Sequence, residues 1–257
     1  MKPAAAPKSP LVTAWLVIYN LFAICGWAYV DYLLYQHYAA TGTLYGASLW
    51  RAMALPVKVM QTAALLEVAH AALRLVPSNP AMAFIQGARP IFLSAPSAQP
   101  FSFSLLPHPT TTPPPRAVGA RLAVLWGIID QSPDAQVSPM LFLCFLAWAL
   151  VEVPRYSFYV LKLLGVAPLY AHTWLRYSLF IVLYPAGIVG EFGCLVYAFP
   201  ASAALAVAQP NAYNIAYSHQ LVLGVLALLY LPGSPTMISH MWRERAKALG
   251  GAPVKEA

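Results

Sequence analysis

The stretch that decides the fold class is WLRYSLFIVLYPAGIVGEFGCLVYAF, residues 174–199. It carries only two charged residues, Arg176 and Glu191, and it is longer than the roughly 20 apolar residues that a helix needs to cross a bilayer. Lipid offers the backbone no hydrogen-bond partners, so a long continuous apolar run favours a helix over strands. The stretch therefore predicts a transmembrane helix.

The rest of the chain repeats this pattern, with further apolar runs at 11–35, 49–73, 118–132, 137–153 and 213–232. The run at 118–132 is short, and residues 80–86 (PAMAFIQ) are expected to supply its start. The 257 residues are 60% hydrophobic and 9% charged, with a mean hydropathy of +0.63, whereas soluble domains carry about 25% charged residues. A soluble enzyme and a disordered chain are both excluded. The sequence predicts one all-α domain over residues 1–257, a bundle of six transmembrane helices.

Residues 87–117 differ in kind from the apolar runs. These 31 residues hold 8 of the 24 prolines and end in a Pro/Thr cluster (PHPTTTPPPRA). Proline at this density is incompatible with a regular helix. The segment is predicted to be an insert, either disordered or produced by an error in the gene model.

The basic residues predict the orientation in the membrane. Eleven of the 15 Lys and Arg residues fall on one side of the six predicted spans, and Arg51 alone falls in a loop on the other. Cytoplasmic loops of membrane proteins carry the excess of Lys and Arg. Both termini are therefore predicted to be cytosolic. The net charge of +7 is attributed to these cytosolic basic residues, and no nucleic-acid partner is expected. The eleven are Lys2, Lys8, Arg74, Arg89, Arg116, Arg155, Lys162, Arg243, Arg245, Lys247 and Lys255.

The strongest chemical signal is the recurrence of Tyr177, Tyr184 and Glu191 every seven residues. Seven helical steps nearly complete two turns, so the three side chains share one face, with Tyr184 and Glu191 about 10 Å apart along the axis. An ionisable group costs about 2.5–3.5 kcal/mol inside a membrane, which makes Glu191 a candidate for function. A phenol and a carboxylate in one groove form a plausible proton donor and acceptor, and Pro185 between them is expected to bend the helix. The alternatives are a tyrosine stripe that only packs and a glutamate that only pairs with an arginine.

The pattern indicates no metal or cofactor. Cys25, Cys144 and Cys194 lie in apolar runs without the spacing of a zinc site. Glu67 and His70 are one helical turn apart, an arrangement that suits a buried hydrogen-bond pair better than a metal or proton site.

Several motifs resemble one known family, the very-long-chain (3R)-3-hydroxyacyl-CoA dehydratases, also called protein-tyrosine-phosphatase-like membrane proteins. The similarity covers about residues 11–86 and 118–240, and its most specific elements are ExxRYxFY (152–159), WLRY (174–177) and LYPxGxxxE (183–191). The resemblance implies a six-span endoplasmic reticulum enzyme with cytosolic termini. It also implies the third step of very-long-chain fatty acid elongation, the dehydration of (3R)-3-hydroxyacyl-CoA to trans-2-enoyl-CoA, in association with the other elongation enzymes.

The same resemblance assigns catalysis to Tyr184 and Glu191, without deciding which is the acid and which is the base. Around them, candidate substrate-binding residues lie near the predicted cytosolic mouth, where basic side chains meet CoA phosphates or anchor the helix ends: Arg155, Tyr156, Lys162, Arg176 and Tyr177. Glu152 and Arg155 have the spacing of an ion pair that would orient Tyr156 or Tyr159, although Pro154 lies between them.

One departure from the family concerns the insert. Gly87-Ala88-Arg89 and Gly119-Ala120-Arg121 repeat 32 residues apart, so deleting about 31 residues would rejoin 80–86 to 118–131 as one helix. Two rival functions remain. A non-catalytic scaffold of the same fold is disfavoured by the retention of both catalytic residues. A small proton-coupled transporter using Glu67, His70 and Glu191 is disfavoured because the halves show no inverted repeat.

Overall fold

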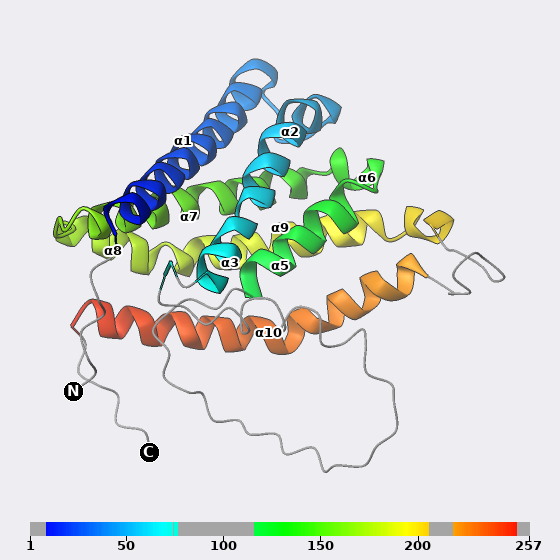
Figure 1. The fold of residues 1–257 in the computed structure, drawn as a ribbon. Coiled ribbons are helices and arrows are strands. Elements are labelled where there is room, and N and C mark those ends of the chain that lie inside the picture. Colours follow the sequence, from blue (N-terminus) through cyan, green and yellow to red (C-terminus); the bar gives the residue numbers. More distant parts are fainter. Residues whose placement is uncertain (1–8, 74, 77–115, 206–217, 251–257) are drawn as a thin grey trace, which may run out of the picture. The chain divides into compact units, whose positions relative to one another are not determined.

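The computed structural model describes residues 9–73, 75–76, 116–205 and 218–250 (Figure 1). All regular structure in these residues is helical, and they contain no strand, which confirms the all-α part of the prediction. The predicted start of the third span at 80–86 and residues 87–115 of the predicted insert lie outside the described residues.

Four helical segments are long and apolar enough to cross a membrane. They are α1 (Pro10–Thr41), the pair α2 (Ala47–Ala63) and α3 (Leu65–Ala72), α7 (Pro139–Leu163), and the pair α8 (Tyr170–Ser178) and α9 (Phe180–Ala198). α10 (His219–Ala248) contains two apolar halves that meet at 41° and make a fifth candidate. A shorter apolar helix, Gly119–Ile129, coincides with the short third run. Four or five spans are thus observed in the described part, whereas six were predicted.

The chain divides into two compact units. Unit 2, residues 61–122, contains the end of α2, all of α3 and α5 (Arg116–Leu122) among its described residues. Unit 1 comprises residues 1–60 and 123–257 and contains every candidate site residue named above except Glu67 and His70. Its remaining elements are the π-helix η1 (Ala123–Ile129), α6 (Pro133–Gln136) and the 3-10 helix η2 (Ala201–Leu205).

The ends of α1 follow local chemistry. Ser9 caps the N-terminus by accepting a 3.3 Å hydrogen bond from the Val12 amide, and Pro10 occupies the first helical position. At the other end Gly42 adopts φ 67°, the left-handed conformation that glycine tolerates, and its amide reaches the Tyr38 carbonyl. α1 therefore extends from Pro10 to Thr41, past the end of the predicted apolar run 11–35.

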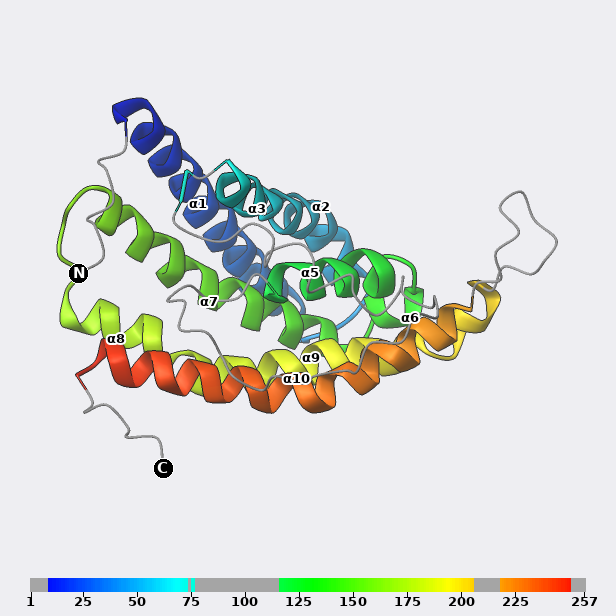
Figure 2. The ribbon, with the colours of Figure 1, turned by 60° about the horizontal axis from the view of Figure 1, so that its bottom comes forward.

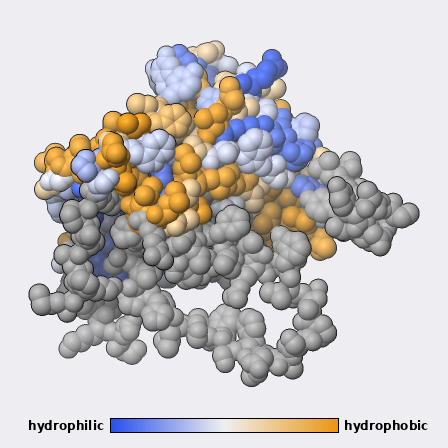
Figure 3. Space-filling model, viewed as in Figure 1, coloured by the Kyte–Doolittle hydropathy of each residue, from blue (hydrophilic) through white to orange (hydrophobic). Residues whose placement is uncertain are grey.

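Unit 1 is organised around α7, which packs against both α1 and α9 (Figures 1 and 2). The buried residues of α1 recur at helical spacing along one face: Leu16, Tyr19, Ala23, Trp27, Val30 and Leu34. They join a core with Phe145, Trp148 and Tyr156 of α7. Large apolar side chains are also exposed, among them Ile18, Val182 and Leu228. Figure 3 shows hydrophobic areas in orange on the face that it displays. Such an exposed apolar surface fits lipid contact.

α9 approaches α7 through glycines. Gly190 lies so close to Cys144 that a Cβ atom there would come within 2.5 Å of the Cys144 backbone nitrogen. Small residues permit this close helix packing, which is typical of membrane proteins. The close contact holds Glu191 near α7.

One end of unit 1 gathers basic residues. The ring of Tyr19 near the start of α1 packs edge-on against Tyr156 near the end of α7, 6.1 Å between centroids. Arg245 near the end of α10 donates a 3.1 Å hydrogen bond to the hydroxyl of Ser178 at the end of α8. α8 and the end of α10 lie together on the left in Figures 1 and 2. The segments predicted to face the cytosol through Arg155, Arg176 and Arg245 thus share one end.

Candidate active site

Glu191 is held between three helices. Its side chain, half-buried on α9, accepts a 2.6 Å hydrogen bond at Oε1 from the indole Nε1 of Trp148 on α7. At Oε2 it accepts a 2.5 Å hydrogen bond from the hydroxyl of Tyr230 on α10. Each carboxylate oxygen therefore has its own donor, which is how a charged group becomes tolerable at membrane depth.

Tyr184 lies two turns before Glu191 on the same helix and is also half-buried. Its hydroxyl lies near Ser234 on α10 and near the Glu191 carboxylate. α9 continues through Pro185; the helical run is interrupted earlier, at Leu179 between α8 and α9. The proline therefore lies inside α9 without ending it.

Trp148 and Tyr230 were not identified from the sequence. Both sit in predicted spans, 43 and 39 residues from Glu191, and look like ordinary apolar packing residues. The available signal was general: a buried tryptophan N–H or tyrosine O–H needs a partner, and Glu191 offers acceptors. Nothing in the spacing showed that these two aromatics face Glu191.

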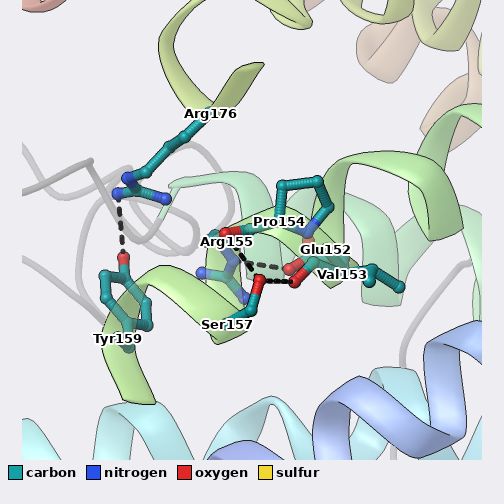
Figure 4. A network of polar contacts seen from close by, with 7 residues as sticks. All are labelled: Glu152, Val153, Pro154, Arg155, Ser157, Tyr159 and Arg176. Atoms are coloured by element: carbon teal, nitrogen blue, oxygen red, sulfur yellow. Dashed lines mark hydrogen bonds and ion pairs between the residues drawn. The ribbon is translucent and has the colours of Figure 1, made fainter. Parts of the chain in front are cut away.

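Three of the candidate binding residues, Lys162, Arg176 and Tyr177, lie with Phe158 and Tyr159 where α7 meets α8; these five residues are here called the basic–aromatic cluster. The Arg176 guanidinium lies 4.8 Å, 4.9 Å and 5.2 Å from the ring centroids of Phe158, Tyr159 and Tyr177. It donates a 3.4 Å hydrogen bond to the Tyr159 hydroxyl, drawn in Figure 4. Lys162 lies 4.7 Å from the Phe158 centroid. Cation–π contacts therefore hold the Lys162 and Arg176 side chains against the rings of this cluster. Tyr177 packs edge-on against Phe158 of α7. It therefore belongs to this cluster, although the sequence predicted that it shares a face with Tyr184 and Glu191.

The predicted Glu152–Arg155 ion pair is present. Arg155 Nε lies 2.5 Å from Glu152 Oε2 in the network of Figure 4, although Pro154 stands between them. The guanidinium also stacks 4.4 Å from the Tyr156 centroid and 5.9 Å from that of Tyr159. Arg155 therefore contacts the rings of both tyrosines, whereas the prediction named Tyr156 or Tyr159.

No group of three or more His, Cys, Asp or Glu side chains suited to a metal ion occurs among the described residues. Glu67 and His70 lie one turn apart on α3. A shallow hollow of about 370 Å³ is lined by Asp134, Val137, Val196, Tyr197 and Pro200. Neither Tyr184 nor Glu191 lines it.

The segment that holds Tyr184 and Glu191 is similar in sequence to a known family. The sequence pattern described as "Protein tyrosine phosphatase-like protein, PTPLA" matches residues 109–251, which is more than half of the chain and includes both Tyr184 and Glu191. The chain belongs to this family.

The relatives are similar to this chain over most of their length. The chain is 31% identical to the human "Very-long-chain (3R)-3-hydroxyacyl-CoA dehydratase 2" over 243 residues, covering 93% of this chain and 82% of that protein. The dog dehydratase 1 is 29% identical over 249 residues, 96% of this chain and 86% of the relative. The "Very-long-chain (3R)-3-hydroxyacyl-CoA dehydratase PASTICCINO 2" of Arabidopsis thaliana is 31% identical over 239 residues, which cover 91% of this chain and 92% of that protein. No solved structure matches the chain.

Proposed function

We propose that this chain removes water from a long-chain (3R)-3-hydroxyacyl-CoA, giving a trans-2-enoyl-CoA, with Tyr184 and Glu191 as the catalytic residues. It is a hydro-lyase of very-long-chain fatty acid elongation, because its relatives carry this activity in their names. The site assignment depends on the environment of Glu191, which lies on the same membrane helix as Tyr184. Its carboxylate accepts hydrogen bonds from two donors on other helices.

The reaction requires a base and an acid. The base takes a proton from C2 of the acyl chain, the C2–C3 double bond forms, and the C3–O bond breaks. The acid gives its proton to the departing hydroxyl, which leaves as water. The proton held by the base then returns to the acid through solvent, which restores both groups.

Glu191 is the proposed base and Tyr184 the proposed acid. Trp148 Nε1–H can only donate, so Glu191 Oε1 must accept. The Tyr230 hydroxyl donates to the other oxygen. The carboxylate still has free lone pairs for the C2 proton. Tyr184 retains a transferable phenolic proton.

The CoA moiety is proposed to bind at the end of unit 1 that holds Arg155, Lys162 and Arg176, with Tyr156 and Tyr177 lining the entrance. Arginine suits phosphate groups because its planar fork donates several hydrogen bonds. In this arrangement the aromatic rings fix the direction of the guanidinium groups before substrate arrives.

The finer membrane arrangement is part of the proposal. It places six spans in the endoplasmic reticulum membrane with both termini in the cytosol, as one domain that associates with the other elongation enzymes. The third span is built from 80–86 and 118–131 if 87–117 is absent from the mature protein. Transcript reads that join these two segments support that proposal, whereas a peptide from residues 90–115 detected by mass spectrometry contradicts it.

The test of the activity is dehydration of a long 3-hydroxyacyl-CoA by the purified chain in proteoliposomes. We expect turnover by the wild-type chain and losses of at least about 100-fold in Tyr184→Phe and Glu191→Gln, the usual range for removing an acid or base. Near wild-type turnover in both variants contradicts the site assignment, and an inactive wild-type chain contradicts the function.

A further inference from the structure

We propose that Tyr230 is a positioning residue of the dehydration reaction, which acts by holding the Glu191 carboxylate in place for C2-proton abstraction. The inference rests on the proposed function of Glu191 as the base. It assigns a role in the reaction to α10, which the motif containing Tyr184 and Glu191 does not reach.

The geometry around Glu191 is selective. Trp148 and Tyr230 approach from two different helices and reach two different oxygens, at 2.6 Å and 2.5 Å. The Tyr230 ring is itself held by Phe192, edge-on at 6.3 Å between centroids. The last side-chain torsion of a glutamate is broad by itself. Hydrogen bonds to both carboxylate oxygens fix that torsion.

The register of α10 against α9 supports the same role. Ser234 comes four residues after Tyr230, just beyond the bend in α10, and its hydroxyl lies near Tyr184. Since the two helices run in opposite directions, the pair 230 and 234 on α10 faces the pair 191 and 184 on α9. The part of α10 around its bend therefore lies beside both proposed catalytic side chains.

Removal of the Tyr230 hydroxyl leaves the ring in place but frees one carboxylate oxygen. A hydrogen bond to a charged group contributes about 1.5–3 kcal/mol, which corresponds to about 10- to 150-fold in rate if it acts on the reacting state. Tyr230→Phe is thus expected to lower kcat about 10- to 100-fold and to change KM less than about twofold, because Tyr230 serves the base and not the CoA end.

The experiment is a double-mutant cycle on the full chain in proteoliposomes, measured with enzyme in excess so that very slow turnover remains measurable. If Tyr230 acts through Glu191, Tyr230→Phe has less than about a threefold effect in the Glu191→Gln background, because coupled residues are non-additive. Tyr197→Phe is the matched control. Tyr197 is exposed near the end of α9, and losing its hydroxyl is expected to leave both constants unchanged.

Each outcome is decisive. The same fold loss in both backgrounds, or a loss carried by KM, shows a merely structural role and overturns the inference. Wild-type kcat in Tyr230→Phe, together with an inactive Glu191→Gln, also overturns it while leaving the proposed function intact. Wild-type turnover in Glu191→Gln contradicts the site assignment itself.

Discussion

Gly190 of α9 lies directly against the backbone of Cys144 in α7, with 2.5 Å between a Cβ atom built on the glycine and the cysteine nitrogen. This contact brings Trp148, one helical turn beyond Cys144, to the carboxylate of Glu191, the residue that follows Gly190. The hydrogen bond between Trp148 and Glu191 therefore depends on the close packing of α7 against α9.

Gly190→Ala tests this coupling. The added methyl group meets backbone that cannot rotate away, so we expect a loss of about 1–3 kcal/mol in stability and a fall in kcat as Trp148 moves from Glu191. Thermal unfolding in detergent and turnover in proteoliposomes measure the two effects. Gly187→Ala is the control, because its Cβ would lie 3.5 Å from that of Ala147, an ordinary contact. Equal behaviour of the two variants contradicts the prediction.

Arg155→Met tests the ion pair in the network of Figure 4. Glu152 is only 7% exposed and Arg155 20%, so removing the cation costs about 2–3 kcal/mol of stability. Glu152→Gln combined with Arg155→Met is expected to recover part of the loss. The control has the same i, i+3 spacing on the surface: Lys247, 60% exposed, pairs with Glu244, and Lys247→Met is expected to cost less than about 0.5 kcal/mol. Equal losses in the two variants would show that burial is not the cause.

Arg176→Gln tests the proposed CoA end. KM for a 3-hydroxyacyl-CoA is expected to rise about tenfold, the equivalent of one charge-assisted hydrogen bond, with little change in kcat. The corresponding pantetheine thioester lacks the nucleotide phosphates and should show no rise. Arg243→Gln removes the same charge from an exposed site on α10 and serves as the control. A rise in KM with both substrates would assign Arg176 to packing of the basic–aromatic cluster alone.

Lys58→Met tests the opposite end of unit 1. The Lys58 ammonium pairs with Asp130 and lies 4.8 Å and 5.5 Å from the ring centroids of Trp126 and Trp50. Its removal is expected to lower stability by about 1–3 kcal/mol, which thermal unfolding measures. Arg51→Met, an exposed position on the same helix, is the control and should change stability by less than about 0.5 kcal/mol. A stable Lys58→Met variant would contradict the prediction.

Sequence reasoning succeeded where the interaction is local. The Glu152–Arg155 pair needed only i, i+3 spacing, and it forms despite Pro154. It succeeded less well at the helix boundaries. The last predicted run, 213–232, corresponds to α10, whose described helix begins at His219 and continues to Ala248 with a bend. Hydropathy marks where a chain is apolar, but polar turns of a helix can extend beyond the membrane without any change in local propensity.

By itself the sequence determined the helical membrane class, and the periodicity that places Tyr184 and Glu191 on one helix. These properties follow from composition and from the fixed pitch of a helix. Only the tertiary structure decided that Trp148 and Tyr230 are the partners of Glu191. The physical reason is that membrane helices are apolar on most faces, so a pattern along one helix cannot specify which face of which neighbour it meets. That choice depends on close contacts such as Gly190 against Cys144, which exist only once the helices have packed.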